Sequence, residues 1–240
     1  MQSVVAVTGD VDTSLDTVRA LRAKVEQLQG RSLDTPVLPT HPALAALLPG
    51  RGLRSGASYA LGASMSLLSA LLAAPSQEGS WCAVVGMPEF GVEAAAHGGV
   101  DLSRLVLVPD PGPRWLAITS AIAEVIPVVA LRPPGRARDA EVARLSARMR
   151  DRGTVLLVQG PWPQTEAMIA VDEGQWSGLG EGHGLLAARE LTVTVSSRRF
   201  PVPRQERMLL PSPDGRLAPV AEGRSRIRSP QDLAPLRSAV

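Results

Sequence analysis

The sequence predicts an α/β fold: a mostly parallel sheet flanked by helices, with an N-terminal helix before it and an irregular C-terminal tail after it. Five short apolar runs alternate with stretches of helical periodicity, which is typical of parallel strands joined by crossover helices. From Pro201 onward, prolines and arginines dominate and the periodicity fades. We therefore divide the chain into an N-terminal helix with a Pro-rich connector (1–44), a core (45–200) and an Arg/Pro-rich flexible tail (201–240).

The first element is an amphipathic helix over residues 12–29. Its apolar side chains recur at spacings of three and four, and they are Leu15, Val18, Leu21, Val25 and Leu28. Gly30 ends the helix, and a connector punctuated by proline and glycine follows over residues 31–56. The apolar stripe either packs on its own domain or docks on a partner protein, and the periodicity leaves both alternatives open.

The alternating elements of the core follow the connector. The expected strands are residues 57–61, 81–85, 104–108, 126–131 and 154–158, and the expected helices are 65–74, 92–97, 114–124 and 137–152. Pro75 is expected to close the first of these helices. Beyond Gly160, residues 168–171 and 191–196 are expected to form strands at an antiparallel edge of the sheet, with the glycine-rich stretch 176–184 as their connection.

Composition limits the functional classes. The chain has 240 residues, 45% of them hydrophobic and 20% charged, which suits one α/β domain with appendages. We expect a cytoplasmic protein, since no basic leader and no apolar run of about 20 residues stands out. The formal net charge is +2, but residues 198–240 hold 9 arginines against 4 acids.

The basic excess makes the tail a candidate surface for an acidic partner or for DNA. Its candidate side chains are Arg198, Arg199, Arg204, Arg207, Arg224, Arg226 and Arg228. The acids among them and the scarcity of aromatic side chains predict that direct DNA binding, if present, is weak.

The stretch YALGASMSLLSALL, residues 59–72, has the order of a phosphate-binding loop: strand, glycine turn, helix N-terminus. Gly62, Ala63, Ser64, Met65 and Ser66 form this candidate loop. The motif G-x-x-x-x-G-K-[ST] is incomplete, because the second glycine is missing and the one lysine of the chain, Lys24, lies elsewhere. We interpret the loop as a degenerate remnant and expect Gly62→Ala to affect folding more than any nucleotide-dependent property.

Other catalytic groups are equally sparse. The strand at 126–131 runs into Arg132-Pro133-Pro134, where a metal-holding carboxylate would be needed, and Glu89 is expected to be a solvated loop side chain. Neither the three histidines nor Cys82 has metal-ligand spacing, and Cys82 is expected to be buried and inert. Core or loop packing is expected for the tryptophans, with Trp176 as the exposed exception. We predict no catalytic residue, no metal site and no cofactor.

The order of these segments resembles a RecA-like core. The phrase Gly99-Val100-Asp101-Leu102-Ser103-Arg104-Leu105 ahead of a strand is similar to one in RecA-type proteins. The helix RLSARMRDRG and the phrase Trp176-Ser177-Gly178 bring the chain closer to ImuA-type proteins, RecA-like accessory members of bacterial SOS mutagenesis cassettes. The likeness spans roughly residues 45–200, and the shorter actinobacterial ImuA-prime branch is the most similar.

The resemblance implies a non-enzymatic role in error-prone translesion DNA synthesis. The implied partner is an ImuB-like relative of Y-family polymerases, reached through the N-terminal helix or the tail, with RecA as a further candidate and recruitment to the nucleoid at damaged DNA. Two alternatives stay open: an atypical RecA-type ATPase that binds ATP and is stimulated by DNA, and a SulA-like inhibitor of cell division.

Overall fold

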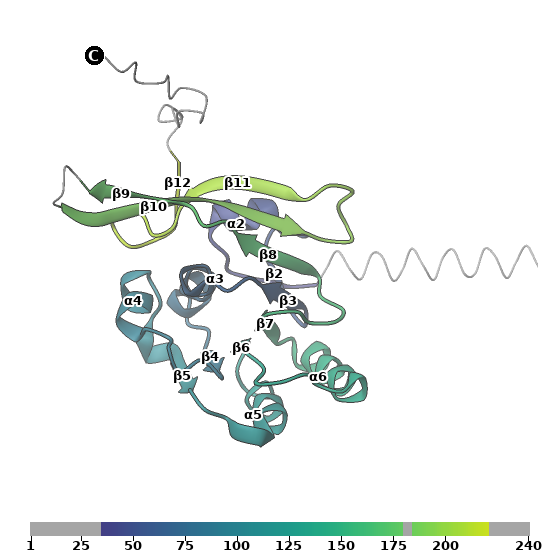
Figure 1. The fold of residues 1–240 in the computed structure, drawn as a ribbon. Helices are drawn as coiled ribbons and strands as arrows, with labels where there is room; N and C mark the ends of the chain where they lie inside the picture. Colours follow the sequence, from purple (N-terminus) through teal and green to yellow (C-terminus); the bar gives the residue numbers. More distant parts are fainter. Residues whose placement is uncertain (1–34, 180–183, 221–240) are drawn as a thin grey trace, which may run out of the picture.

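The computed structural model describes residues 35–179 and 184–220, and its centre is a twisted ten-stranded sheet with helices on both faces (Figure 1). The strands of this sheet are β3 (Ser58–Leu61), β4 (Cys82–Val85), β5 (Leu105–Val108), β6 (Val128–Leu131), β7 (Val155–Gln159), β8 (Ala167–Val171), β9 (Gln175–Leu179), β10 (Gly184–Ser196), β11 (Arg204–Leu209) and β12 (Ala218–Pro219). The helices are α2 (Pro42–Leu47), α3 (Met65–Gln77), α4 (Val92–His97), α5 (Trp115–Ile122) and α6 (Asp139–Arg152). A separate two-stranded ribbon pairs β1 (Val37–Leu38) with β2 (Leu53–Arg54).

Six strands of the sheet run parallel, in the order β8-β3-β7-β6-β4-β5. Five of them, β3 to β7, correspond to the five apolar runs of the sequence, so this prediction is confirmed. Their side chains are buried on both faces in all but β5, as expected for strands covered by helices on each side. The fold is therefore α/β with a mostly parallel sheet.

Two apolar clusters fill the space on the two faces. One contains the buried side of α3 with Leu67 and Leu71, and the other contains the buried side of α6 with Val142 and Met149. Figure 1 shows α3 and α4 on one face, and α5 and α6 on the other. Cys82 is fully buried in β4, and burial raises the pKa of its thiol to about 12, so the thiol stays protonated at neutral pH.

Two details of the expected core are wrong. The strand expected at 168–171 is β8, and it pairs antiparallel with β10 as expected, but its other neighbour is β3, to which it runs parallel. Helix α3 does not stop before Pro75 but continues to Gln77. Pro75 lies in the last turn, so it removes one hydrogen bond, the one to the Leu71 carbonyl, and the helix ends two residues later.

The region expected to be an irregular tail also contains ordered strands. β11 pairs with the full second half of β10, from Val195↔Arg204 to Glu190↔Leu209, and β12 continues the sheet. Met208 and Leu210 are buried in the same cluster as α3. The sequence does not indicate this strand, because the first three side chains of β11 are polar and exposed. Its pairing with β10 holds it in the sheet.

The start of the described chain packs on the core as well. Leu44 and Leu47 of α2 belong to the α3-side cluster, so the core begins upstream of residue 45. His41 caps α2, with its Nδ1 atom accepting from the Ala43 amide at 3.3 Å. The expected N-terminal helix, with its stripe Leu15, Val18, Leu21, Val25 and Leu28, lies outside the described residues.

Candidate functional site

The carboxyl edge of the parallel strands is where ligand sites of α/β sheets are built. Gly62 follows β3 at this edge, Gly86 follows β4, Arg132 follows β6, and Gln159 ends β7. These positions decide whether the fold can hold a nucleotide and a metal ion.

The degenerate loop directs its polar groups toward its own chain. The Gly62 amide donates to the Ile169 carbonyl at 2.9 Å, and the Ser64 amide donates to the Gly62 carbonyl at 2.8 Å. The Ser64 hydroxyl caps α3 by accepting from the Leu67 amide at 3.2 Å. Two backbone amides and the Ser64 hydroxyl of the Gly62–Ser66 segment are thus already paired, and the buried hydroxyl serves as a helix cap rather than as a ligand for a cation.

Arg132 occupies the place where a RecA-type site is expected to hold a metal-binding carboxylate. Its Nε atom donates to Gln159 Oε1 at 2.7 Å, and its guanidinium forms an ion pair with Glu89. Glu89 was expected to be a solvated loop side chain. It is half exposed, but it is paired with the Arg132 guanidinium. A hydrogen bond from its own backbone amide, together with the Arg132 side chain, lowers the pKa of Glu89.

The backbone around Arg132 is also tightly packed. The Arg132 amide donates to the Val85 carbonyl at 3.0 Å, which ties the end of β6 to the end of β4. Gly86 has φ +77, and a Cβ atom there would lie 2.4 Å from the Arg132 carbonyl oxygen. Only glycine fits this position, so the backbone segments that follow β4 and β6 lie in close contact.

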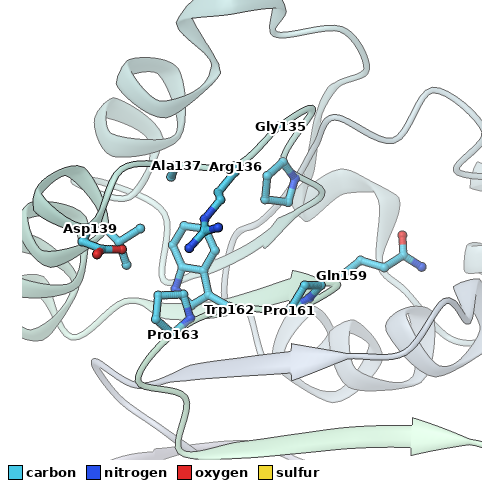
Figure 2. Close-up of a pocket in the computed structure, with 10 residues that line it drawn as sticks. Gly135, Arg136, Ala137, Asp139, Gln159, Pro161, Trp162 and Pro163 are labelled. Carbon is cyan, nitrogen blue, oxygen red and sulfur yellow. The ribbon is translucent and has the colours of Figure 1, made fainter.

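A pocket of about 630 Å³ opens on the same edge, between the ends of β6 and β7 and the start of α6. We call it the Trp162 pocket (Figure 2). It is lined by Pro133, Gly135, Arg136, Ala137, Asp139, Val142, Gln159, Pro161, Trp162 and Pro163. Val142 and Trp162 belong to the α5–α6 cluster, whereas Met65 of the glycine loop packs on the α3 cluster, so the pocket and the loop lie on different faces of the sheet.

Trp162 carries the one buried side-chain nitrogen or oxygen in the described part of the chain that has no hydrogen-bond partner, its Nε1 atom. The side chain is only 9% exposed. Sequence reasoning assigned Trp162 to core or loop packing and missed this unpaired donor. One feature of the sequence could have indicated that these two loops meet. Pro133-Pro134 and Pro161-Trp162-Pro163 directly follow two of the expected strands.

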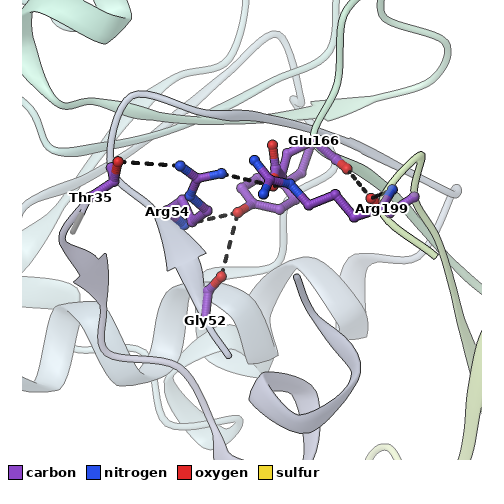
Figure 3. Close-up of polar contacts among 7 residues, drawn as sticks. Thr35, Gly52, Arg54, Glu166 and Arg199 are labelled. Atoms are coloured by element: carbon purple, nitrogen blue, oxygen red, sulfur yellow. Dashed lines mark hydrogen bonds and ion pairs between the residues drawn. The ribbon is translucent and has the colours of Figure 1, made fainter. Parts of the chain in front are cut away.

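The tail arginines that the structure describes take part in internal contacts. Glu166 accepts from Arg54 at 3.1 Å and from Arg199 at 2.7 Å, as Figure 3 shows, and Arg54 also contacts Thr35. Glu166 thereby joins the β1–β2 ribbon, the start of β8 and the turn between β10 and β11. Arg199 therefore has a structural role at the amino edge of the sheet, away from the glycine loop.

The remaining tail arginines lie in four different settings. Arg204 stacks over Phe200, 3.6 Å from the ring centroid, and donates to the Ala46 carbonyl at 3.3 Å. Arg207 forms an ion pair with Glu190 across the β10–β11 ladder. Arg198 is exposed. Arg224, Arg226 and Arg228 lie outside the described residues, so the seven arginines do not form one surface within the described part.

Comparison with solved structures defines the class of fold. The chain has a RecA-like fold: it superimposes on the crystal structure of the RadB recombinase with a TM-score of 0.55 and 15% sequence identity, over 74% of this chain and 96% of that one. At this identity the likeness concerns the fold alone.

Comparison with sequences gives a narrower similarity. Residues 46–164 match the model of a family described as the MT3502 N-terminal domain. The chain is also 34% identical over 144 residues to the Uncharacterized protein Rv3395c of Mycobacterium tuberculosis, covering 59% of this chain and 66% of that protein, just under two thirds of its length. In the described residues, no helix is long and apolar enough to span a membrane.

Proposed function

We propose that the protein is a non-catalytic RecA-like adaptor that supports error-prone translesion DNA synthesis in SOS-induced mutagenesis. It acts through protein contacts with an ImuB-like relative of Y-family polymerases, in the cytoplasm and at damaged DNA in the nucleoid. The observation that supports this role best is Arg132, bound by Glu89 and Gln159 at the position of the metal-binding carboxylate. A guanidinium there repels a divalent cation and pairs with the Glu89 carboxylate.

The glycine loop also supports a non-catalytic role. A triphosphate needs a lysine or arginine and several free amides in its loop. Residues 62–66 contain no basic side chain, and the Gly62 and Ser64 amides are already paired. The similarity to a mycobacterial protein agrees with the actinobacterial branch that the sequence resembles.

Co-purification with the ImuB-like protein of the same organism tests the proposal. The full chain is compared with a variant that lacks residues 1–34, which removes the Leu15–Leu28 stripe, and with one that ends at residue 220, which removes Arg224, Arg226 and Arg228. We expect the full chain to form the complex and one of the two deletions to abolish it, while circular dichroism shows that each variant is folded.

A folded full chain that does not bind the ImuB-like protein contradicts the proposal. So does a strain lacking the gene whose damage-induced mutation frequency is unchanged. Cell filamentation on overexpression, without any effect on mutagenesis, favours the SulA-like alternative instead.

A further inference from the structure

A groove of about 460 Å³ lies between α5 and α6, and it shares no lining residue with the Trp162 pocket. Apolar side chains from both helices line it, among them the buried Leu145 and the half-buried Leu116. Arg114, Arg144 and Arg148 also line the groove, and all three are exposed. The groove thus combines an apolar lining with an accessible basic rim.

The apolar lining continues as an exposed row along α5. Pro113, Ala117, Ala121 and Val125 follow one another at a spacing of four, which places them on one side of the helix, and all of them are exposed. Val125 is 79% exposed, the largest value for any large hydrophobic side chain in the described part of the chain. Because the outward face of a surface helix is normally polar, this row indicates a surface that another molecule covers.

The charges beside this row are predominantly positive. Arg148 reaches across to α5, where it donates to Ser120 Oγ at 2.7 Å and forms an ion pair with Glu124 at 3.0 Å. Glu141, the one acid that lines the groove, accepts from the Arg138 amide at 3.0 Å. Both acids therefore already have partners within the fold.

Two arginines of the groove remain to bind a ligand. Within the described residues, Arg114 and Arg144 form no ion pair, and the Nε atom of Arg144 contacts only the Ala140 carbonyl of its own helix, at 3.3 Å. A carboxylate that pairs with such an exposed guanidinium forms a charge-assisted hydrogen bond, often with two contacts. The groove is thus suited to a ligand that carries carboxylates beside an apolar surface.

An amphipathic helix has this arrangement of groups. The apolar row of α5 spans twelve residues, from position 113 to position 125, or roughly 18 Å at 1.5 Å per residue. A helix with leucines at a spacing of four and glutamates in the neighbouring row presents an apolar and an acidic stripe of the same length. Such helices commonly bind by placing their apolar face in a groove.

Other occupants fit this surface less well. The phosphates of a nucleic acid would pair with the arginines but would leave the apolar row uncovered, and the lining contains no aromatic side chain for base stacking. A second copy of the chain bound through the same face would bring like charges together. The terminal segments 1–34 and 221–240 hold five acids against four basic side chains and two acids against four, so neither is distinctly acidic.

We propose that the groove between α5 and α6 binds an acidic amphipathic helix of a partner protein. The apolar side chains of that helix cover Ala117, Ala121 and Val125, and its carboxylates pair with Arg114 and Arg144. The inference goes beyond the adaptor role, since it concerns a surface distinct from the N-terminal stripe and the tail and holds whichever protein carries the helix.

Binding of a labelled (Glu-Leu-Ala-Ala)4 peptide to the full chain tests the proposal, because this alanine-rich sequence forms a helix with adjacent acidic and apolar rows. We expect saturable binding, and at least roughly tenfold weaker binding of the basic counterpart (Lys-Leu-Ala-Ala)4. Arg144→Glu weakens binding of the acidic peptide by about tenfold or more. Arg150→Glu makes the same charge change on α6, outside the groove lining, and leaves the affinity within about twofold.

Val125→Ser tests the apolar row separately from the charges. Since Val125 is exposed, the variant keeps the fold, which circular dichroism checks, but it weakens the acidic peptide by about threefold or more. Absence of saturable binding, equal affinity for the basic peptide, or unchanged affinity in Arg144→Glu or Val125→Ser overturns the proposal. The oligonucleotide dT12 is the competing probe: if it displaces the peptide and its own affinity falls with Arg144→Glu but not with Val125→Ser, the groove is a nucleic-acid site instead.

Discussion

Arg132 shows how one residue changes the chemistry available at the edge of a sheet. The side chain follows β6, and it is held by Glu89 from the end of β4 and by Gln159 from the end of β7. A carboxylate at position 132 would face Glu89 and attract a cation, whereas the arginine neutralises Glu89 without one. The RecA-like fold is thus retained, although the position expected to hold a metal-binding carboxylate is taken by the Arg132–Glu89 ion pair.

Gly62 illustrates the opposite case, a residue that suggests function by its type but has an ordinary environment. Its φ lies outside the left-handed region, and a Cβ atom there would meet Ala170 at 3.6 and 3.7 Å, which is normal van der Waals contact. We expect Gly62→Ala to change the free energy of unfolding by less than about 1 kcal/mol in urea denaturation. The expectation from sequence, that this substitution would mainly disturb folding, is not supported by these contacts.

Gly86→Ala is the matched comparison for Gly62→Ala. The left-handed φ and the 2.4 Å approach to the Arg132 carbonyl predict a loss of at least about 2 kcal/mol. If Gly62→Ala and Gly86→Ala lowered the free energy of unfolding equally, the close packing of Gly86 against Arg132 would not explain the need for glycine at position 86.

At the scale of elements, β11 and the turn that follows it decide where the domain ends. Met208, Leu210 and Leu217 are buried in the α3-side cluster, although they lie in the stretch that composition assigns to the tail. The β10–β11 ladder also positions Arg207 opposite Thr192, from where it forms an ion pair with Glu190 two residues along β10. The strand is thus part of the core, and its arginines stabilise the sheet.

Two truncations test this assignment. A chain that ends at residue 220 keeps all three side chains. Its free energy of unfolding is expected to lie within about 1 kcal/mol of the value for the full chain. A chain that ends at residue 200 loses them and is expected to lose at least about 4 kcal/mol, since burying each such side chain contributes roughly 1.5–3 kcal/mol. Chemical denaturation of both gives the comparison, and equal stability would place the domain boundary near residue 200 after all.

For the whole molecule, the five parallel strands β3 to β7 were predictable because they are continuous apolar runs between glycine turns and amphipathic helices. The parallel pairing of β8 with β3 was not predicted, and the exposed polar side chains of β11 hide its pairing with β10. The absence of a lysine from the glycine loop and the arginine at position 132 were visible in the sequence. The ion pair of Arg132 with Glu89 and the unpaired Trp162 donor depend on loops that meet only in the fold.

The most direct test of the adaptor account is equilibrium binding of labelled ATP to the full chain with Mg²⁺, in the presence and absence of single-stranded DNA. We predict no saturable binding up to about 1 mM ATP, a limit that corresponds to roughly 4 kcal/mol of binding free energy. Saturable micromolar binding that Gly62→Ala or Ser66→Ala weakens, with stability unchanged, would contradict the account and favour a RecA-type ATPase.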